Sequence, residues 1–156
     1  MDRKRRVPLI ELGFARAEDL PRLADLLAEL FTLESDFQPM RDKQLRGLRL
    51  ILDNPALGQL FVLRVDGAVA GMANALITVS TAEGGRVVLL EDVIVSRAHR
   101  GGGLGRQLVE QVLDWARQQG YRRITLLADQ NNHAAWVFYR KLGFEASQMG
   151  VLRKAL

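Results

Sequence analysis

The chain contains no cysteine. It therefore forms no disulfide bond, and it has neither a cysteine nucleophile nor a thiolate metal site. Long apolar runs are also missing, because none reaches the roughly 18 residues that a membrane-spanning helix requires. No apolar segment follows the charged N-terminus, so we expect no secretory signal. Together these absences favour a cytoplasmic protein with no membrane partner.

Little excess of basic over acidic charge remains outside the N-terminus. The net charge is +4 at pH 7, and residues 1–6 alone carry four basic side chains and one acidic side chain. A protein that binds nucleic acid usually shows a basic face on its folded body, so we expect no nucleic-acid partner. We predict a basic, flexible tail over residues 1–7 and a single domain over residues 8–156.

Helical and strand patterns alternate along the rest of the chain. Apolar residues recur at helical spacing in residues 18–31, 41–52, 104–119 and 134–142. Runs rich in β-branched residues predict strands at residues 9–14, 60–65, 69–79, 87–95 and 124–128, with one or two final strands within 144–152. Asp66 and Gly67 join two of these runs at the spacing of a β-hairpin. This order predicts a mixed α/β (α+β) fold, in which helices flank a largely antiparallel central sheet.

A glycine-rich segment lies between a predicted strand and the long predicted helix. It reads Arg100, Gly101, Gly102, Gly103, Leu104, Gly105. Glycine lets the backbone turn tightly and brings its N–H groups close to an anion. The following helix adds its unpaired N–H groups and its positive dipole end, and the arginine adds a permanent charge. The segment therefore predicts a diphosphate cradle for a nucleotide-bearing cofactor.

Two common cradles do not fit this segment. The nucleoside-triphosphate loop ends in Gly-Lys-Ser/Thr, and no such pair follows these glycines. The dinucleotide pattern Gly-x-Gly-x-x-Gly fails as well, because its last position falls on Arg106 or on Leu108. The remaining pattern is Arg-x-x-Gly-x-Gly.

This pattern resembles the coenzyme A loop of the GCN5-related N-acetyltransferases (GNAT), which reads Gln/Arg-x-x-Gly-x-Gly/Ala. A second family pattern, Asn-x-x-Ala-x-x-Leu/Phe-Tyr-x-x-x-Gly-Phe, occurs later in the chain. The matching residues are Asn132, Ala135, Phe138, Tyr139, Gly143 and Phe144. The resemblance implies the GNAT fold and acetyl-CoA as cofactor, with no metal.

The resemblance also implies which residues hold the cofactor. Residues 93–95 correspond to a strand that splays away from its neighbour and pairs with the pantetheine arm. The implied cofactor-binding residues are Val93, Ile94, Val95, Arg100, Gly101, Gly102, Gly103, Leu104, Gly105, Arg106, Asn132, Ala135 and Tyr139. A helix N-cap is the alternative role for Asn132, unless Asn131 caps the helix and leaves Asn132 free.

Tyr139 and Glu91 are the candidate catalytic residues. A thioester expels a thiolate, and a phenol with a pKa of about 10 can donate a proton to it; this Tyr is the usual general acid of the family. An incoming amine must lose a proton first, and Glu91 is placed to accept it. Adjacent strand residues face opposite sides of a sheet, so we expect only one of Glu91 and Asp92 to face the cleft. The alternative for Tyr139 is a packing role. The alternative for Glu91 and Asp92 is an ion pair that supports the loop.

The substrate side of the site is less specific in sequence. In the family the region between the first two helices forms a substrate wall, which implies substrate-binding roles for Glu34, Asp36 and Phe37. Acidic groups there attract a cationic amine, although a solvated loop explains them equally well. Residues 90–95 resemble the diamine and glucosamine-phosphate branches of the family, in which a Glu-Asp pair lies at the substrate, and this implies a substrate-binding or structural role for Asp92. His99 and His133 have no partner at ligand spacing, so we expect both to be exposed and neither to bind metal.

The sequence thus predicts an acetyl-CoA-dependent N-acetyltransferase that moves an acetyl group to a primary amine by direct attack on the thioester. The acceptor is a small-molecule or peptide amine of undetermined identity. The alternative is a non-catalytic acyl-CoA-binding sensor or partner module, whose cradle would be the same. The oligomeric state also stays open, with a homodimer among the options.

Overall fold

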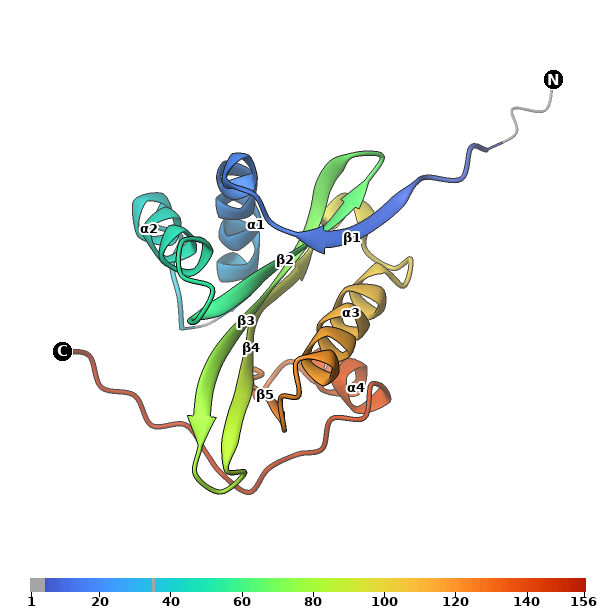
Figure 1. Cartoon of the computed structure of the whole chain (residues 1–156). Helices are drawn as coiled ribbons and strands as arrows, with labels where there is room; N and C mark the ends of the chain where they lie inside the picture. The colour runs from blue at the N-terminus through green and yellow to red at the C-terminus, as the bar shows by residue number, and fades with distance from the viewer. Residues whose placement is uncertain (1–4, 35) are drawn as a thin grey trace.

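Five strands form a single sheet in the order β1-β2-β3-β4-β5 (Figure 1). The computed structural model describes residues 5–34 and 36–156, so residues 1–4 of the expected tail lie outside the described residues. All neighbouring strands are antiparallel except β4 and β5, which are parallel. The strands are β1 Ile10–Phe14, β2 Gly58–Val65, β3 Ala68–Ser80, β4 Gly85–Val95 and β5 Ile124–Leu126. The expected mixed, largely antiparallel sheet is confirmed.

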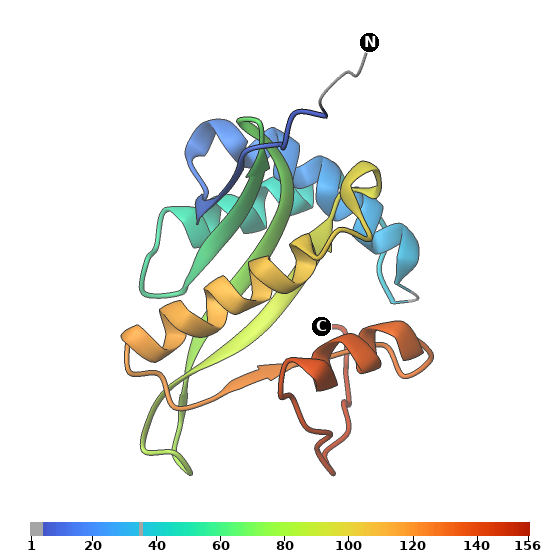
Figure 2. The ribbon, with the colours of Figure 1, turned by 90° about the vertical axis from the view of Figure 1, so that its right-hand side faces the viewer.

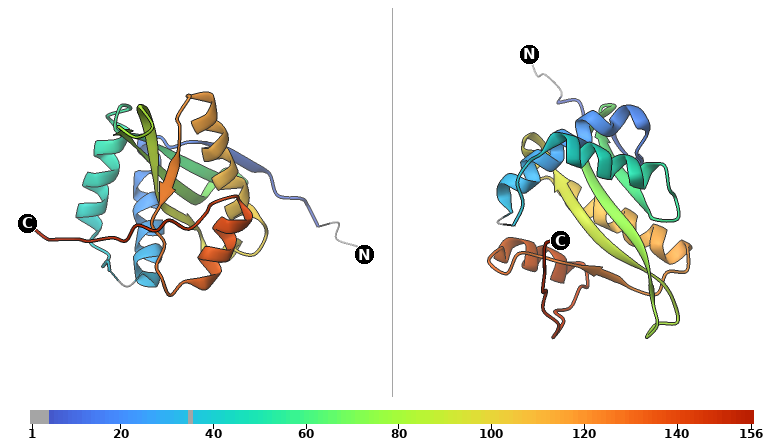
Figure 3. Two further views of the ribbon diagram at one scale, coloured as in Figure 1. Left: turned by 90° about the horizontal axis from the view of Figure 1, so that it is seen from below. Right: turned by 90° about the vertical axis from the view of Figure 1, so that its left-hand side faces the viewer.

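Helices cover both faces of this sheet (Figure 3, left). The helices are α1 Leu20–Leu33, α2 Arg41–Leu52, α3 Leu104–Gln118 and α4 His133–Lys141. One face carries α1 and α2, while α3 and α4 lie together on the other face (Figure 2). The chain before α1 forms a short 3-10 turn at Ala17–Asp19, so the first helix begins slightly later than its apolar pattern predicts.

Each face has its own core because side chains alternate along the strands. On the α1 side, Leu23 and Leu26 pack against Val62 and Met72. On the α3 side, the buried stripe of that helix packs against the alternate strand residues, such as Phe61. Burial of apolar side chains is the main stabilising contribution to a folded domain. It also determines which strand residues point toward each helix layer.

The final strands predicted within residues 144–152 are wrong. From Phe144 to the C-terminus the chain forms no helix or strand, and Met149 and Leu152 are fully or almost fully exposed. A local turn competes with strand pairing, because the Met149 N–H donates to the Ser147 hydroxyl at 3.1 Å. The segment instead runs past the end of the sheet toward the side of α2 (Figure 3, left).

Candidate active site

A β-bulge in β4 gathers the candidate carboxylates on one face of the sheet. Asn74 of β3 pairs with Glu91, but Met72 pairs with Ile94, so β4 carries one extra residue between these pairs. Asp92 lies in this bulge with a φ of 55°, a conformation that non-glycine residues adopt at a cost. A bulge interrupts regular alternation. The premise that adjacent residues face opposite sides therefore does not hold at Glu91 and Asp92.

Asp92 is a half-buried carboxyl group that accepts a hydrogen bond from a buried asparagine. Burial, together with the charge of Glu91, raises the pKa of Asp92 to about 6, although a hydrogen bond from Asn74 acts in the opposite direction. That bond runs from the Asn74 Nδ2 to the Asp92 Oδ2 at 3.3 Å. Asn74 is itself buried, and its Oδ1 accepts no hydrogen bond. The group is thus poised to change its protonation state close to neutral pH.

Glu34 reaches the same region from the C-terminal end of α1. Its backbone N–H donates to the Leu30 carbonyl at 3.1 Å and closes the last helical turn. Burial raises the pKa of Glu34 to about 6, and neighbouring negative charges add to this effect. In decreasing order, these charges belong to Asp92, Glu91, Asp129 and Asp36. The end of α1, β4 and the segment after β5 therefore contribute to one acidic region.

The other predicted wall residues lie at its exposed margin. Asp36 forms an ion pair with Arg153 at 2.9 Å. The guanidinium of Arg153 also lies over the Phe37 ring, 5.3 Å from its centroid, and that ring stacks obliquely on Phe31 at 5.5 Å. The C-terminal segment thus contacts the connection between α1 and α2.

Tyr139 projects from α4 into the same electrostatic environment. Its ring makes edge-to-face contacts with Phe138 at 5.0 Å and with Phe144 at 5.5 Å between centroids. Burial, with a contribution from the charge of Glu34, raises the pKa of Tyr139 to about 12. The phenol is therefore a proton donor throughout the physiological pH range.

The glycine segment leads into the N-terminus of α3. Gly101 and Gly103 have φ values of 84° and 77°. Glycine adopts such positive values readily because it has no Cβ to clash with the backbone. A Cβ added at Gly101, Gly102 or Gly103 meets no atom within 4 Å, whereas one at Gly105 meets the Phe138 ring at 3.7 Å. The loop therefore presents open backbone beside the unpaired N–H groups of the first helical turn.

The two arginines near this loop are held in different ways. The Arg100 Nε donates to the Val95 carbonyl at 2.8 Å, and its guanidinium lies 3.9 Å from the Glu29 carboxylate. Arg106 lies in the first turn of α3, where it forms an exposed ion pair with Glu110 at 2.8 Å. Arg100 is thus anchored between the loop and α1, while Arg106 stands at the surface beside Leu104.

The strand segment at residues 93–95 lies beyond the pairing between β4 and β5. That pairing covers only Val88–Leu90 of β4 against Ile124–Leu126. Val93 packs toward the α3 core and Ile94 toward the α1 core, so their side chains are engaged inside the protein. On this side of β4, a ligand would meet the backbone of residues 93–95.

The start of α4 shows which of Asn131 and Asn132 caps this helix. The Asn132 Oδ1 accepts a hydrogen bond from the Ala135 N–H at 3.1 Å, so Asn132 is the N-cap of the helix. The alternative in which Asn131 caps the helix is wrong. The Asn131 N–H instead donates to the Asp129 carboxylate at 3.0 Å.

Two residues near the site were missed from the sequence. Asn74 is a polar residue inside the apolar run that forms β3, and a buried polar residue in such a run is a signal in itself. Asp129 lies shortly after β5, beyond the carboxyl end of this parallel strand, where ligands of α/β sheets often bind. His133 is exposed as expected, but the expectation for His99 is wrong because it is half-buried.

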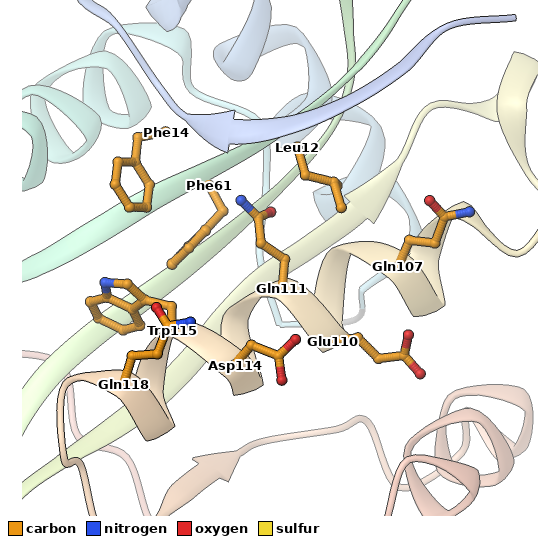
Figure 4. A pocket seen from close by; sticks show the side chains of 9 residues that line it. All are labelled: Leu12, Phe14, Phe61, Gln107, Glu110, Gln111, Asp114, Trp115 and Gln118. Carbon is orange, nitrogen blue, oxygen red and sulfur yellow. The ribbon is translucent and has the colours of Figure 1, made fainter.

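A separate cavity of about 410 Å³ lies between α3 and the β1 edge (Figure 4). Its walls are Leu12, Phe14, Phe61, Gln107, Glu110, Gln111, Asp114, Trp115 and Gln118. None of these residues belongs to the predicted site. Over the described ranges, no group of three or more His, Cys, Asp or Glu side chains is arranged to hold a metal ion. No helix there is long and apolar enough to cross a membrane.

Comparisons with known proteins agree with this architecture. A glucosamine 6-phosphate N-acetyltransferase of Trypanosoma brucei brucei is 32% identical over 91 residues, which cover 58% of this chain and 60% of that protein. The match thus spans less than two thirds of this curated relative. A crystal structure described as a possible acetyltransferase from Clostridium difficile 630 superposes with a TM-score of 0.86 at 19% identity, covering 95% of this chain and 98% of that one.

Two further matches concern the cofactor and the family. An aminoglycoside N-acetyltransferase in complex with CoA superposes with a TM-score of 0.80 at 22% identity, covering 97% of each chain. Both superpositions show the shared fold. The family model described as "Acetyltransferase (GNAT) family" matches residues 20–144, which include the glycine loop, the carboxylates and Tyr139. The chain therefore belongs to the GNAT acetyltransferase family.

Proposed function

We propose that this chain is an acetyl-CoA-dependent N-acetyltransferase that transfers an acetyl group to a primary amine. The observation that carries the proposal is a convergence of groups beyond Leu90, where β5 no longer pairs with β4. An open glycine loop, a half-buried tyrosine and the carboxylates of the bulge all lie at this end of the sheet. Such a set of groups provides for diphosphate binding, proton donation and proton acceptance.

The loop suits the diphosphate of coenzyme A. The three glycines at residues 101–103 leave room for an anion beside their N–H groups. Arg106 and the guanidinium nitrogens of Arg100 that do not bind Val95 add positive charge. The backbone of residues 93–95 is placed to pair with the pantetheine arm as an added strand would. We place Leu104, Gly105, Asn132 and Ala135 along the same path, with Asn132 using its amide Nδ2.

Acetyl-CoA, when bound, supplies the acetyl thioester. Glu91 accepts a proton from the ammonium of the acceptor, directly or through a water molecule. The free amine then forms a C–N bond to the acetyl carbon while the C–S bond breaks. A backbone N–H near Val93 stabilises negative charge on the carbonyl oxygen. Tyr139 donates its proton to the departing sulfur, and the second proton that the nitrogen loses restores the phenol. The products are an acetamide and the free thiol.

Asp92 is placed to hold the acceptor rather than to remove its proton. It accepts a hydrogen bond from Asn74, so it orients a charged group beside Glu91. We further propose that residues 8–156 form one domain that contains the whole site, and that the N-terminal tail contributes nothing to it.

The experiment measures coenzyme binding and thiol release separately. Calorimetry with acetyl-CoA should show binding, and a panel of primary amines should release free coenzyme A thiol in proportion to acetylated product. Glu91→Gln should retain binding and lose most turnover, because a neutral amide accepts no proton. Binding without turnover on any amine would favour the non-catalytic module, and absence of binding would overturn the proposal altogether.

A further inference from the structure

The strand β1 lies at one edge of the sheet, where half of its backbone groups have no strand to pair with. In the part of the chain that the structure describes, β2 is its single neighbour in the sheet. The Ala15 N–H donates to a β2 carbonyl at 2.9 Å, and the Leu9 carbonyl accepts a hydrogen bond at the other end of the pair at 2.8 Å. Bonded and unbonded residues alternate along an antiparallel pair. The N–H and C=O groups of Ile10, Leu12 and Phe14 therefore point away from the sheet.

The side chains of these three residues form an apolar strip on the α3 face. Leu12 and Phe14 are 39% and 52% exposed, while Ile10 packs against the α3 core. Phe14 makes an edge-to-face contact with Phe61 at 5.4 Å between centroids. Leu12 and Phe14 also line the cavity between α3 and β1, toward which both point in Figure 4. An apolar strip, a cavity and unpaired backbone groups thus lie along the same edge.

This edge lacks the usual protection against pairing with another chain. Natural edge strands are often blocked by lysine, by proline or by a bulge. The strand β1 contains neither lysine nor proline, and it pairs with β2 in regular register. Its one charged residue is Glu11. A regular and partly apolar edge of this kind accepts an added strand.

We propose that β1 pairs with β1 of a second copy of this chain, antiparallel about a two-fold axis at Leu12. In this register Ile10 lies opposite the partner's Phe14, and Leu12 lies opposite its own copy. The outward N–H and C=O groups of all three residues then form hydrogen bonds, so the two sheets become continuous. The partner's strand also extends the apolar strip beside the cavity. The dimer does not depend on the proposed function.

The charges along this edge fit a second copy. The same register places Glu11 opposite the partner's Gly13, so the two carboxylates do not oppose each other. Beyond the strand, it brings Arg6 toward the partner's Glu18. Both residues are exposed and form exposed ion pairs within their own chain, so this contact adds a charge of opposite sign to each pair. A two-fold axis repeats every contact, which makes the strand complementary to itself.

Sedimentation equilibrium on the full chain tests the pairing over about a hundredfold range of protein concentration. The mass should rise from 17.5 kDa toward twice that value as the concentration increases. Leu12→Glu places two carboxylates opposite each other at the axis and should raise the dissociation constant of the dimer by about tenfold or more. Leu50→Glu, at a 61% exposed residue of α2, is the control and should leave this constant unchanged.

Two variants of Gly13 test the register. A Cβ at Gly13 meets no atom within 4 Å in its own chain, so both variants should fold, and thermal unfolding should give them similar Tm values. Gly13→Glu repels the partner's Glu11, whereas Gly13→Lys attracts it. Because each contact occurs twice, the dissociation constant of the dimer should rise in the first variant and fall in the second, each by about threefold to tenfold.

A monomer at every concentration would overturn the inference, and so would a species larger than a dimer. A dimer that Leu12→Glu leaves intact, or one that responds alike to both Gly13 variants, would contradict the pairing as well. The strands β1 and β5 lie at opposite edges of the sheet, so Leu12→Glu should bind acetyl-CoA as the wild type does. Failure of the dimer therefore leaves the acetyltransferase proposal in place, and the reverse also holds.

Discussion

Burial raises the pKa of both Tyr139 and Asp92, yet the two raised values have different consequences. Loss of solvation penalises the charged form of each group. The pKa of Tyr139 rises to about 12, so the phenol stays protonated at physiological pH and its proton remains available to a departing thiolate. The pKa of Asp92 rises to about 6, which brings its protonation equilibrium close to neutral pH. One physical effect therefore yields a phenol that stays protonated and a carboxyl group that titrates close to neutral pH.

Replacing Tyr139 by Phe should lower kcat by about 10²- to 10⁴-fold, the usual contribution of general acid catalysis. The dissociation constant of acetyl-CoA should change little, because the ring keeps its contacts with Phe138 and Phe144. The defect should shrink for thioesters whose thiol is more acidic. Tyr121 packs on Trp115, outside the candidate site, so Tyr121→Phe serves as the control. Wild-type kcat in Tyr139→Phe, measured where chemistry limits the rate, would reduce this residue to packing.

Replacing Asp92 by Asn should stabilise the folded protein at high pH and not at low pH. The folded pKa, about 6, lies above the ordinary value of 3.8. The stability that protonated Asp92 contributes is therefore complete below pH 3.8 and is lost as the pH rises through about 6. An amide never ionises, so the Tm of the variant should exceed that of the wild type at pH 8 but not at pH 4.

Thermal unfolding at both pH values checks this prediction. Asp42→Asn, which removes an exposed carboxylate from the first turn of α2, is the matched control. It should show no such difference between the two pH values. A Tm difference for Asp92→Asn that is the same at pH 4 and pH 8 would contradict the assigned pKa.

At the scale of the elements, α3 carries glycines of the same backbone conformation at both of its ends. Gly103 has a φ of 77° at the N-terminus and Gly120 has a φ of 76° just beyond the C-terminus. A Cβ at either position meets no atom within 4 Å. A substitution therefore brings the same strain to both, while only the first position faces the proposed diphosphate.

Gly103→Ala should weaken acetyl-CoA binding by on the order of tenfold, or about 1.4 kcal/mol. Gly120→Ala should lower the free energy of unfolding by about 1–2 kcal/mol and leave the dissociation constant of acetyl-CoA unchanged. Calorimetry and urea unfolding on both variants separate strain from contact. Equal affinities in the two variants would argue against a cradle at this loop.

The turn before α1 is tied to β2 by a buried ion pair. Arg64 donates to both carboxylate oxygens of Asp19, at 3.0 and 2.7 Å. Burial by itself would raise the pKa of Asp19, but these bonds and one from the Arg16 N–H lower it. The pair therefore holds the entry of α1 against the sheet down to acidic pH.

Asp19→Ala should lower the free energy of unfolding by about 3–5 kcal/mol, because it leaves a buried guanidinium unpaired. Asp25→Ala breaks the exposed pair with Arg41, and should cost no more than about 1 kcal/mol. Urea unfolding at pH 7 compares the two variants. Similar losses would show that burial does not distinguish these pairs.

The sequence predicts most elements because their signals are local. The bounds of α2 match its apolar spacing, and the hairpin forms at Asp66 and Gly67 as its turn residues indicate. The bulge at Asp92 has no such signal, since no glycine marks it. The meeting of Glu34 with β4 depends on how α1 packs over the sheet, which no local pattern encodes. Periodicity also failed at residues 144–152, where a Ser147 turn replaces strand pairing.

On the scale of the whole molecule, the sheet separates two sets of chemical groups. The glycine loop, α3 and Tyr139 belong with the core on one face, while α1 with Glu34 lies over the other. The two sets approach each other beyond Leu90, where β5 no longer pairs with β4: Arg100 lies 3.9 Å from Glu29, and burial together with the charge of Glu34 raises the pKa of Tyr139. Under the proposed function, the coenzyme and the amine therefore enter from opposite faces and are in contact only at the reacting atoms.

Deleting residues 1–6 should leave acetyl-CoA affinity and the turnover of small amines nearly unchanged. These residues hold much of the net charge. Within the described part of the chain, Arg6 forms an ion pair with the exposed Asp66 of the β2–β3 hairpin at 3.3 Å. Loss of such a pair changes stability by no more than about 1 kcal/mol. Calorimetry and steady-state kinetics on the shortened chain check this prediction. A large loss of activity would show that the tail belongs to the site.

The bulge in β4 has a consequence for how this site could diversify. Leu90 and Val93 face the α3 core, while Glu91 and Ile94 face the α1 side. These four residues alternate without interruption if Asp92 is left out. One inserted codon is thus enough to add a carboxylate to the acceptor end while every core side chain keeps its place. Homologous chains that differ by that single residue should share this core and select amines of different charge.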